Sequence, residues 1–239
     1  MSATPATRIG MLVFPGITQL DFTAPYDVLA RMSNSETHVL WKTTDPVLSD
    51  SGLRIVPTTR LADCPDLDIV FVPGGQGLNA LLDDAEVVNF IADKGSRAQW
   101  VTSVCAGSLL LAAAGLLKGY RAACHWASRD ILECFGVTPD PARVVVDRNR
   151  ITGGGVTAGI DFGFVVLAQL RGEAVAKRLQ LIMEYDPQPP FRSGRPEIAE
   201  PELVASVRTA MAPMLAKRRE AAERAAARLR AGAPVAAKV

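Results

Sequence analysis

The chain is built around Trp100-Val101-Thr102-Ser103-Val104-Cys105-Ala106-Gly107-Ser108-Leu109-Leu110-Leu111, which joins two kinds of local pattern. Its first half is a short β-branched and apolar run that predicts a buried strand, and its Leu-rich second half predicts a helix. Cys105 lies at the junction and is followed directly by small residues, so the chain must turn sharply there. This arrangement is typical of a nucleophile elbow, a turn that exposes a reactive side chain at the carboxyl end of a parallel sheet.

The thiol of Cys105 is the first candidate for chemistry. The backbone N–H groups at the start of the following helix carry partial positive charge, which favours a thiolate. We therefore expect the pKa of Cys105 to lie below the value of about 8.5 that a free cysteine has. The alternative is that Cys105 is one more small buried residue, as most intracellular cysteines are. Its position at the elbow favours the nucleophile.

Strand and helix patterns alternate along the rest of the chain. Apolar runs predict buried strands at 9–14 and 68–72, and the second run ends in the glycine-rich segment 73–77. Further patterns predict strands at 37–42, 142–147 and 150–152, and a hairpin or a pair of short strands within 47–56. Helices are predicted at 19–30, 84–97 and 173–185, and another begins with the glycines at 153–155 and continues to about 170. This order predicts a single flavodoxin-like α/β domain, in which a mostly parallel sheet has helices on both faces. The functional site is then expected at the carboxyl edge of the sheet.

Three further groups at predicted strand ends are candidates for the site. Asp21 either caps the helix at 19–30 or points over the strand ends toward Cys105, and the local sequence favours the cap. The backbone N–H groups of Gly75 and Ala106 are suited to stabilising negative charge. A plain tight turn is the alternative interpretation of the glycine cluster.

A second set of candidates comes later in the chain. His125 is one of only two histidines, and it is either a pocket residue or an ordinary half-buried histidine. Gly154, Val156 and Thr157 follow a predicted strand and precede a helix, where glycines leave backbone N–H groups facing a cavity. We regard all four as possible pocket residues.

The composition argues against several classes of function. With 26 basic and 25 acidic residues the net charge is +1, which gives no global attraction to nucleic acid or to an anionic membrane. The mixed charges of 217–224 predict a solvated helix face. Neither a signal peptide nor a membrane span is predicted, so a cytoplasmic protein is expected. The four cysteines have no metal-ligand spacing, and no metal site is predicted.

Several motifs together resemble a known family. The elbow around Cys105 resembles the ThiJ/PfpI group of the class I glutamine-amidotransferase-like superfamily, as do Val72-Pro73-Gly74-Gly75, Ala123-Cys124-His125-Trp126 and Thr152-Gly153-Gly154-Gly155-Val156-Thr157-Ala158-Gly159-Ile160-Asp161. Within that group, three more discriminating segments are similar to the bacterial isocyanide hydratases: Gln19-Leu20-Asp21-Phe22-Thr23-Ala24-Pro25, Glu184-Tyr185-Asp186-Pro187-Gln188-Pro189-Pro190-Phe191 and Lys217-Arg218-Arg219-Glu220. The resemblance covers residues 8–231.

The resemblance implies a homodimeric enzyme that adds water to an isocyanide and releases an N-substituted formamide without a cofactor. It implies that Cys105 is the nucleophile and Asp21 its carboxyl partner, which reverses the local preference for a helix cap at Asp21. The chain departs from those hydratases at Ala106, where they have a threonine, so a hydroxyl contact to the thiol is missing. No histidine follows Cys105, which argues against the Cys–His pair of PfpI-type proteases and deglycases.

Two other function classes stay open. One is a different small-molecule cysteine enzyme of the superfamily, with glyoxalase- or amidase-like activity. The other is a non-catalytic domain, either a ligand sensor like those fused to AraC-type regulators or a redox sensor that oxidises Cys105. The sensor reading is weakened because such regulators need about 100 further residues of DNA-binding domain.

The expected organisation has four parts. Residues 1–7 are predicted to be a flexible N-terminus, and residues 8–200 the α/β domain. Residues 201–231 are predicted to form a helix packed on the same domain, and 232–239 a flexible tail.

Overall fold

The computed structural model describes residues 6–232, and its centre is a seven-stranded sheet. The strand order is β10-β11-β7-β6-β1-β2-β5, and every neighbouring pair is parallel except β10 and β11. The strands are β1 (Thr7–Leu12), β2 (Ser35–Trp41), β5 (Thr59–Arg60), β6 (Ile69–Val72), β7 (Trp100–Val104), β10 (Val144–Asp147) and β11 (Arg150–Gly153). The prediction of a mostly parallel α/β sheet is confirmed.

Smaller elements surround the sheet. The predicted hairpin within 47–56 is confirmed as the antiparallel pair β3 (Val47–Leu48) and β4 (Arg54–Ile55). A short parallel pair, β8 (Arg121–Ala122) and β9 (Thr138–Pro139), lies near the edge strand β10. Two 3₁₀ segments complete the connections, η1 (Leu61–Asp63) and η2 (Arg129–Phe135).

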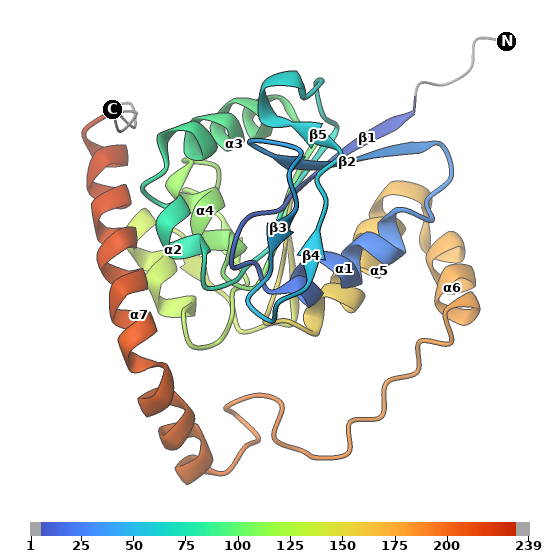
Figure 1. The fold of residues 1–239 in the computed structure, drawn as a ribbon. Helices are drawn as coiled ribbons and strands as arrows, with labels where there is room; N and C mark the ends of the chain where they lie inside the picture. Colours follow the sequence, from blue (N-terminus) through green and yellow to red (C-terminus); the bar gives the residue numbers. More distant parts are fainter. Residues whose placement is uncertain (1–5, 233–239) are drawn as a thin grey trace, which may run out of the picture.

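Helices cover both faces of the sheet (Figure 1). On one face α1 (Gln19–Leu29) packs against α5 (Ala158–Arg171), and α6 (Glu173–Ile182) packs on α5. The other face carries α2 (Leu78–Leu81), α3 (Ala85–Arg97) and α4 (Gly107–Ala113). The long helix α7 (Pro201–Arg230) lies outside these and contacts α2, α4 and η2.

The register of the central strands brings the glycine-rich loop and the elbow together. Val72 of β6 pairs with Ser103 of β7. Gly74 comes two residues after Val72, and Cys105 comes two residues after Ser103. Because both strands are parallel, these two turns leave the sheet at one edge. The carboxyl edge is therefore where the predicted site residues can meet.

Of the two chain ends predicted to be flexible, 1–7 and 232–239, the structure describes residues 6, 7 and 232. Thr7 already belongs to β1, and its N–H donates to the carbonyl of Asn34 at 2.9 Å. Residues 1–5 and 233–239 of the two predicted flexible ends lie outside the described residues. The helix predicted over 173–185 ends earlier, at Ile182, because the chain reverses at Glu184, which has a φ of 50°.

Candidate active site

The elbow has the backbone conformation that a nucleophile elbow requires. Cys105 has a φ of 56°, in the left-handed region that side-chain-bearing residues seldom adopt. Its N–H donates to the carbonyls of Gly153 (3.1 Å) and Gly154 (2.8 Å), so the end of β11 holds the strained residue in place. Gly107, the first residue of α4, packs against the loop that follows β6. A Cβ on Gly107 would lie 2.8 Å from the Pro73 carbonyl oxygen. Only glycine permits this close approach.

Asp21 does not cap α1. The N-cap residue is Thr18, and the Asp21 side chain is instead fully buried, with Oδ2 accepting the Gly74 N–H at 3.1 Å. The local preference for a cap was therefore wrong, because the carboxyl accepts from a strand-end loop rather than from its own helix. Its other oxygen, Oδ1, is buried without a hydrogen-bond partner among the described residues.

Gly74 is the spacer between the two key side chains. A Cβ on Gly74 would lie 2.7 Å from Asp21 Oδ2, 2.7 Å from the Ala106 nitrogen and 2.8 Å from Cys105 Cβ. Asp21 and Cys105 therefore border the same small space, which the hydrogen atoms of a glycine leave open. The sequence pattern pointed to Gly75 in this loop, whereas the residue that contacts the carboxyl is Gly74.

Burial controls the protonation of both groups. It raises the pKa of Asp21 to about 7, against the opposing effects of the Cys105 thiol and the Gly74 N–H. Burial also raises the pKa of the Cys105 thiol well above its ordinary value, and the negative charge of Asp21 raises it further. The expectation of a lowered thiol pKa was wrong in direction, because the N–H groups of Val156 and Ala106 offset only part of the desolvation.

A buried arginine from α7 approaches this centre. Arg218 is 4% exposed and donates to Asn79 Oδ1 (2.8 Å), Ser128 Oγ (2.9 Å) and the Gly75 carbonyl (2.9 Å). Its charge lowers the pKa of Asp21. The prediction that 217–224 is a solvated face fails at this residue.

The sequence does hold a signal for Arg218. The buried residues of α7 recur at helical spacing, and Arg218 heads a stripe of alanines at Ala221, Ala222, Ala225 and Ala226. Such a stripe marks the face that packs on the domain.

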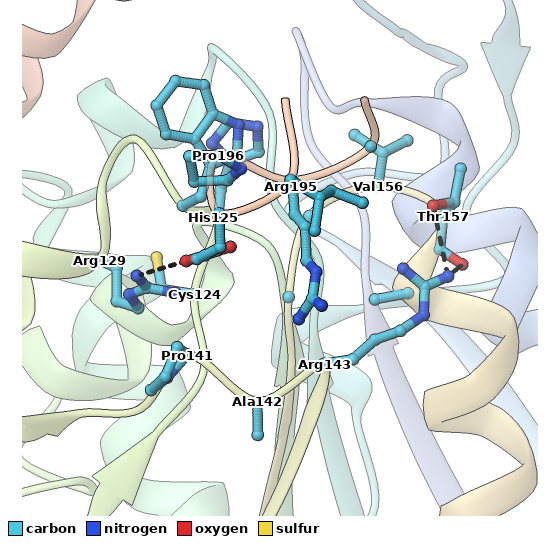
Figure 2. A pocket seen from close by; sticks show the side chains of 17 residues that line it. Cys124, His125, Arg129, Pro141, Ala142, Arg143, Val156, Thr157, Arg195 and Pro196 are labelled. Atoms are coloured by element: carbon cyan, nitrogen blue, oxygen red, sulfur yellow. Dashed lines mark hydrogen bonds and ion pairs between the residues drawn. The ribbon is translucent and has the colours of Figure 1, made fainter. Parts of the chain in front are cut away.

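The four possible pocket residues, His125, Gly154, Val156 and Thr157, lie in the wall of one open cavity of about 510 Å³. Cys105 and Asp21 are not part of that wall. The cavity reaches the elbow through Val156, whose N–H bonds to the Cys105 sulfur. Figure 2 shows Val156 and Thr157 on one side of the cavity and His125 on the other.

His125 is a neutral member of this wall. Burial, reinforced by the charge of Arg218, lowers the pKa of His125 to about 4. Its Nδ1 accepts a hydrogen bond from the Ala127 N–H, with 3.2 Å between the two nitrogens, so the single ring proton belongs on Nε2. His125 can thus donate a hydrogen bond but carries no charge at neutral pH.

Residues 6–232 hold neither a metal cluster nor a membrane-spanning helix. No cluster of three or more His, Cys, Asp or Glu side chains is arranged to hold a metal ion within that range. None of the helices in the same range has the length and apolar character needed to cross a membrane.

Comparisons with known proteins agree with this architecture. Residues 7–169 match the family model described as DJ-1/PfpI family. The chain is 49% identical over 224 residues to the isonitrile hydratase of Pseudomonas putida, covering 94% of this chain and 98% of that protein. A solved ThiJ/PfpI family protein from Pseudomonas syringae superposes with a TM-score of 0.86 at 48% identity, covering 93% of this chain and 91% of the other.

A more distant relative is a regulator. The HTH-type transcriptional regulator GbdR of Pseudomonas aeruginosa is 28% identical over 187 residues, which cover 74% of this chain and 50% of the regulator. The resemblance to the ThiJ/PfpI group is thus confirmed by a family model, by sequence relatives and by a solved structure. The chain belongs to the DJ-1/PfpI family.

Proposed function

We propose that this protein hydrates isocyanides, R–N≡C, to N-substituted formamides through a covalent adduct on Cys105. The observation that carries the proposal is the buried pair of Cys105 and Asp21 across Gly74. The 49% identity to an isonitrile hydratase supports the substrate class. An isocyanide carbon accepts a nucleophile and then a proton, and a thiol beside a carboxyl supplies both.

The first half of the reaction forms the adduct. The Asp21 carboxylate takes the thiol proton while the sulfur attacks the terminal carbon of the isocyanide. Asp21 then delivers that proton to the same carbon, which gives a neutral thioimidate, R–N=CH–S–Cys105. A carboxyl with a pKa of about 7 can accept and release a proton near neutral pH, where acid–base catalysis is most efficient. The raised pKa of the thiol fits this sequence, because the sulfur loses its proton only as it attacks.

The second half releases the product. The Asp21 carboxylate removes a proton from a water molecule, whose oxygen adds to the thioimidate carbon. Asp21 then gives that proton to the nitrogen and is a carboxylate again. The tetrahedral species then expels the sulfur, and the hydroxyl proton returns through Asp21 to the thiolate. The products are R–NH–CHO and the free thiol, so one water has been consumed in total.

The backbone around the sulfur has a supporting role in this proposal. The N–H groups of Gly75 and Ala106 stabilise negative charge on the sulfur or on the adduct. No cofactor takes part in these steps. A homodimer and a cytoplasmic location remain predictions that accompany the proposal.

Mass spectrometry of the intact protein with a simple aryl isocyanide tests both the activity and the route. Formamide, followed by its ultraviolet absorbance, is expected together with a transient adduct on Cys105. Cys105→Ala should stay folded and form no formamide. Asp21→Asn should still react with an alkylating agent at Cys105 but should not turn over. Turnover by folded Cys105→Ala, or normal rates for Asp21→Asn, would remove that residue from the mechanism.

The alternative of a redox sensor fits the site less well. Oxidation of a cysteine depends on its thiolate fraction and its exposure. Cys105 is 6% exposed and its thiol pKa is raised, so both properties work against rapid oxidation.

A further inference from the structure

Three arginines line the cavity beside the elbow. Arg129, Arg143 and Arg195 all line its 510 Å³, from η2, from the segment before β10 and from the connector between α6 and α7. The segment 154–157, between β11 and α5, forms another part of the wall. A volume of this size accommodates a small organic molecule.

Two of these arginines already form ion pairs with carboxylates of the protein. Arg129 pairs with Glu197 at 3.6 Å. Arg143 pairs with Asp161 at the start of α5 and donates to the Thr157 carbonyl at 2.9 Å. These contacts neutralise both guanidinium groups and hold them at the cavity wall.

Arg195 differs from the other two. Among residues 6–232 no carboxylate lies within ion-pair distance of its guanidinium. Figure 2 shows its side chain directed into the space between Arg129 and Arg143. The N-terminus of α5, a helix of 14 residues, adds partial positive charge to the same wall. With His125 neutral, the cavity has a surplus of one cation.

We propose that this cavity binds an anionic group on the substrate, so that the enzyme prefers isocyanides whose substituent ends in a carboxylate. The inference rests on the proposed function, and it assigns the carboxylate to Arg195. A guanidinium presents two parallel N–H groups that match the two oxygens of a carboxylate. The isocyanide carbon faces Cys105 past Val156, and the substituent extends into the cavity.

His125 has a secondary place in this subsite. Its Nε2–H is the ring proton left free once Nδ1 accepts from Ala127. The imidazole ring packs against Gly155, and a Cβ at that position would lie 2.7 Å from His125 Cδ2. The glycine therefore leaves room for the ring at the cavity wall. The neutral imidazole adds a hydrogen-bond donor without adding charge.

The test compares a matched pair of substrates, 4-isocyanobenzoate and its methyl ester. The measured quantity is the ratio of their kcat/KM values for the wild type, Arg195→Gln and the control Arg192→Gln. Arg192 is an exposed arginine of the same connector that does not line the cavity. We expect the ratio to favour the acid in the wild type and to fall about fivefold in Arg195→Gln, the effect of one partly exposed ion pair. In Arg192→Gln the ratio should stay at the wild-type value.

A binding experiment separates this inference from the proposed function. Benzoate is titrated into Cys105→Ala and into Cys105→Ala/Arg195→Gln by calorimetry. A Kd about fivefold weaker in the double variant supports the subsite whether or not either isocyanide is turned over. An equal Kd, or a substrate ratio that Arg195→Gln leaves unchanged, overturns the subsite. Absence of formamide from both isocyanides would overturn the hydratase alone.

Discussion

Replacing Asp21 by asparagine should make the folded protein more stable at alkaline pH, although it removes a residue of the site. The folded carboxyl has a pKa of about 7, whereas the ordinary value is 3.8. Between these two pH values the folded state therefore binds one more proton than the unfolded state. The free energy of unfolding then falls as pH rises through this window and levels off above about pH 7.

The size of the effect follows from the same two values. One pKa unit corresponds to about 1.4 kcal/mol, so burying the ionised carboxylate costs about 4 kcal/mol at pH 8. Asparagine has the same shape, and its carbonyl oxygen can still accept the Gly74 N–H. Asp21→Asn should consequently recover most of this cost. In a domain of this size that gain raises the melting temperature by roughly 10 °C.

Urea denaturation of the wild type and Asp21→Asn at several pH values measures this difference. The gain should be largest at pH 8 and should shrink toward zero near pH 4. Asp27→Asn is the control, because Asp27 is an exposed carboxyl on the same helix and pairs with Arg31 at 2.9 Å. Its effect should stay within about 0.5 kcal/mol at every pH. An Asp21→Asn protein that is no more stable than the wild type at pH 8, or a gain independent of pH, would refute the reasoning.

Three other substitutions test the packing around the pair. Gly74→Ala puts a Cβ 2.7 Å from Asp21 Oδ2 and from the Ala106 nitrogen, so we expect a loss of about 1–3 kcal/mol in unfolding free energy and a rate reduced at least about tenfold; a normal steady-state rate would contradict the proposed geometry. Arg218→Met leaves three acceptors without their donor, two of them buried, which should lower the free energy of unfolding measured by urea denaturation by about 3–5 kcal/mol. The same change removes a cation that lowers the pKa of Asp21, so the Asp21-dependent limb of the kcat/KM pH profile should move to higher pH; an unchanged profile would mean that the charge does not reach the site. Ala106→Thr restores a hydroxyl beside the thiol and should raise kcat, measured with the aryl isocyanide; an unchanged kcat would mean that the hydroxyl is not needed.

The elbow and the sheet were predictable because their signals are local. A β-branched run, a cysteine and small residues before a Leu-rich helix are contiguous in the chain, and the φ of 56° at Cys105 agrees with the sharp turn they predict. The strands likewise appear as short apolar runs, and parallel pairing follows from the helices between them. The two strands at 142–147 and 150–152 were also predicted, and only Arg148 and Asn149 separate them; the structure shows that β10 and β11 pair antiparallel.

Arg218 shows why part of the site was missed. Its neighbours in sequence are charged and exposed, so the local pattern favours a solvated face. Its partners Asn79, Ser128 and Gly75 lie 139, 90 and 143 residues away. A hydrogen-bond set of that kind exists only once α7 has packed on the domain.

The sequence by itself determined most of the long helices and central strands, the elbow and the identity of Cys105 as the residue at the turn, because each depends on neighbours within a few positions. Only the tertiary structure decided how that thiol is protonated. The pairing of Asp21 with the Gly74 N–H spans 53 residues, and the burial of both side chains comes from packing among distant strands and helices. Desolvation of a buried charge exceeds the favourable effect of a nearby helix start, so the environment created by the fold reversed the direction that local sequence predicted for the Cys105 pKa.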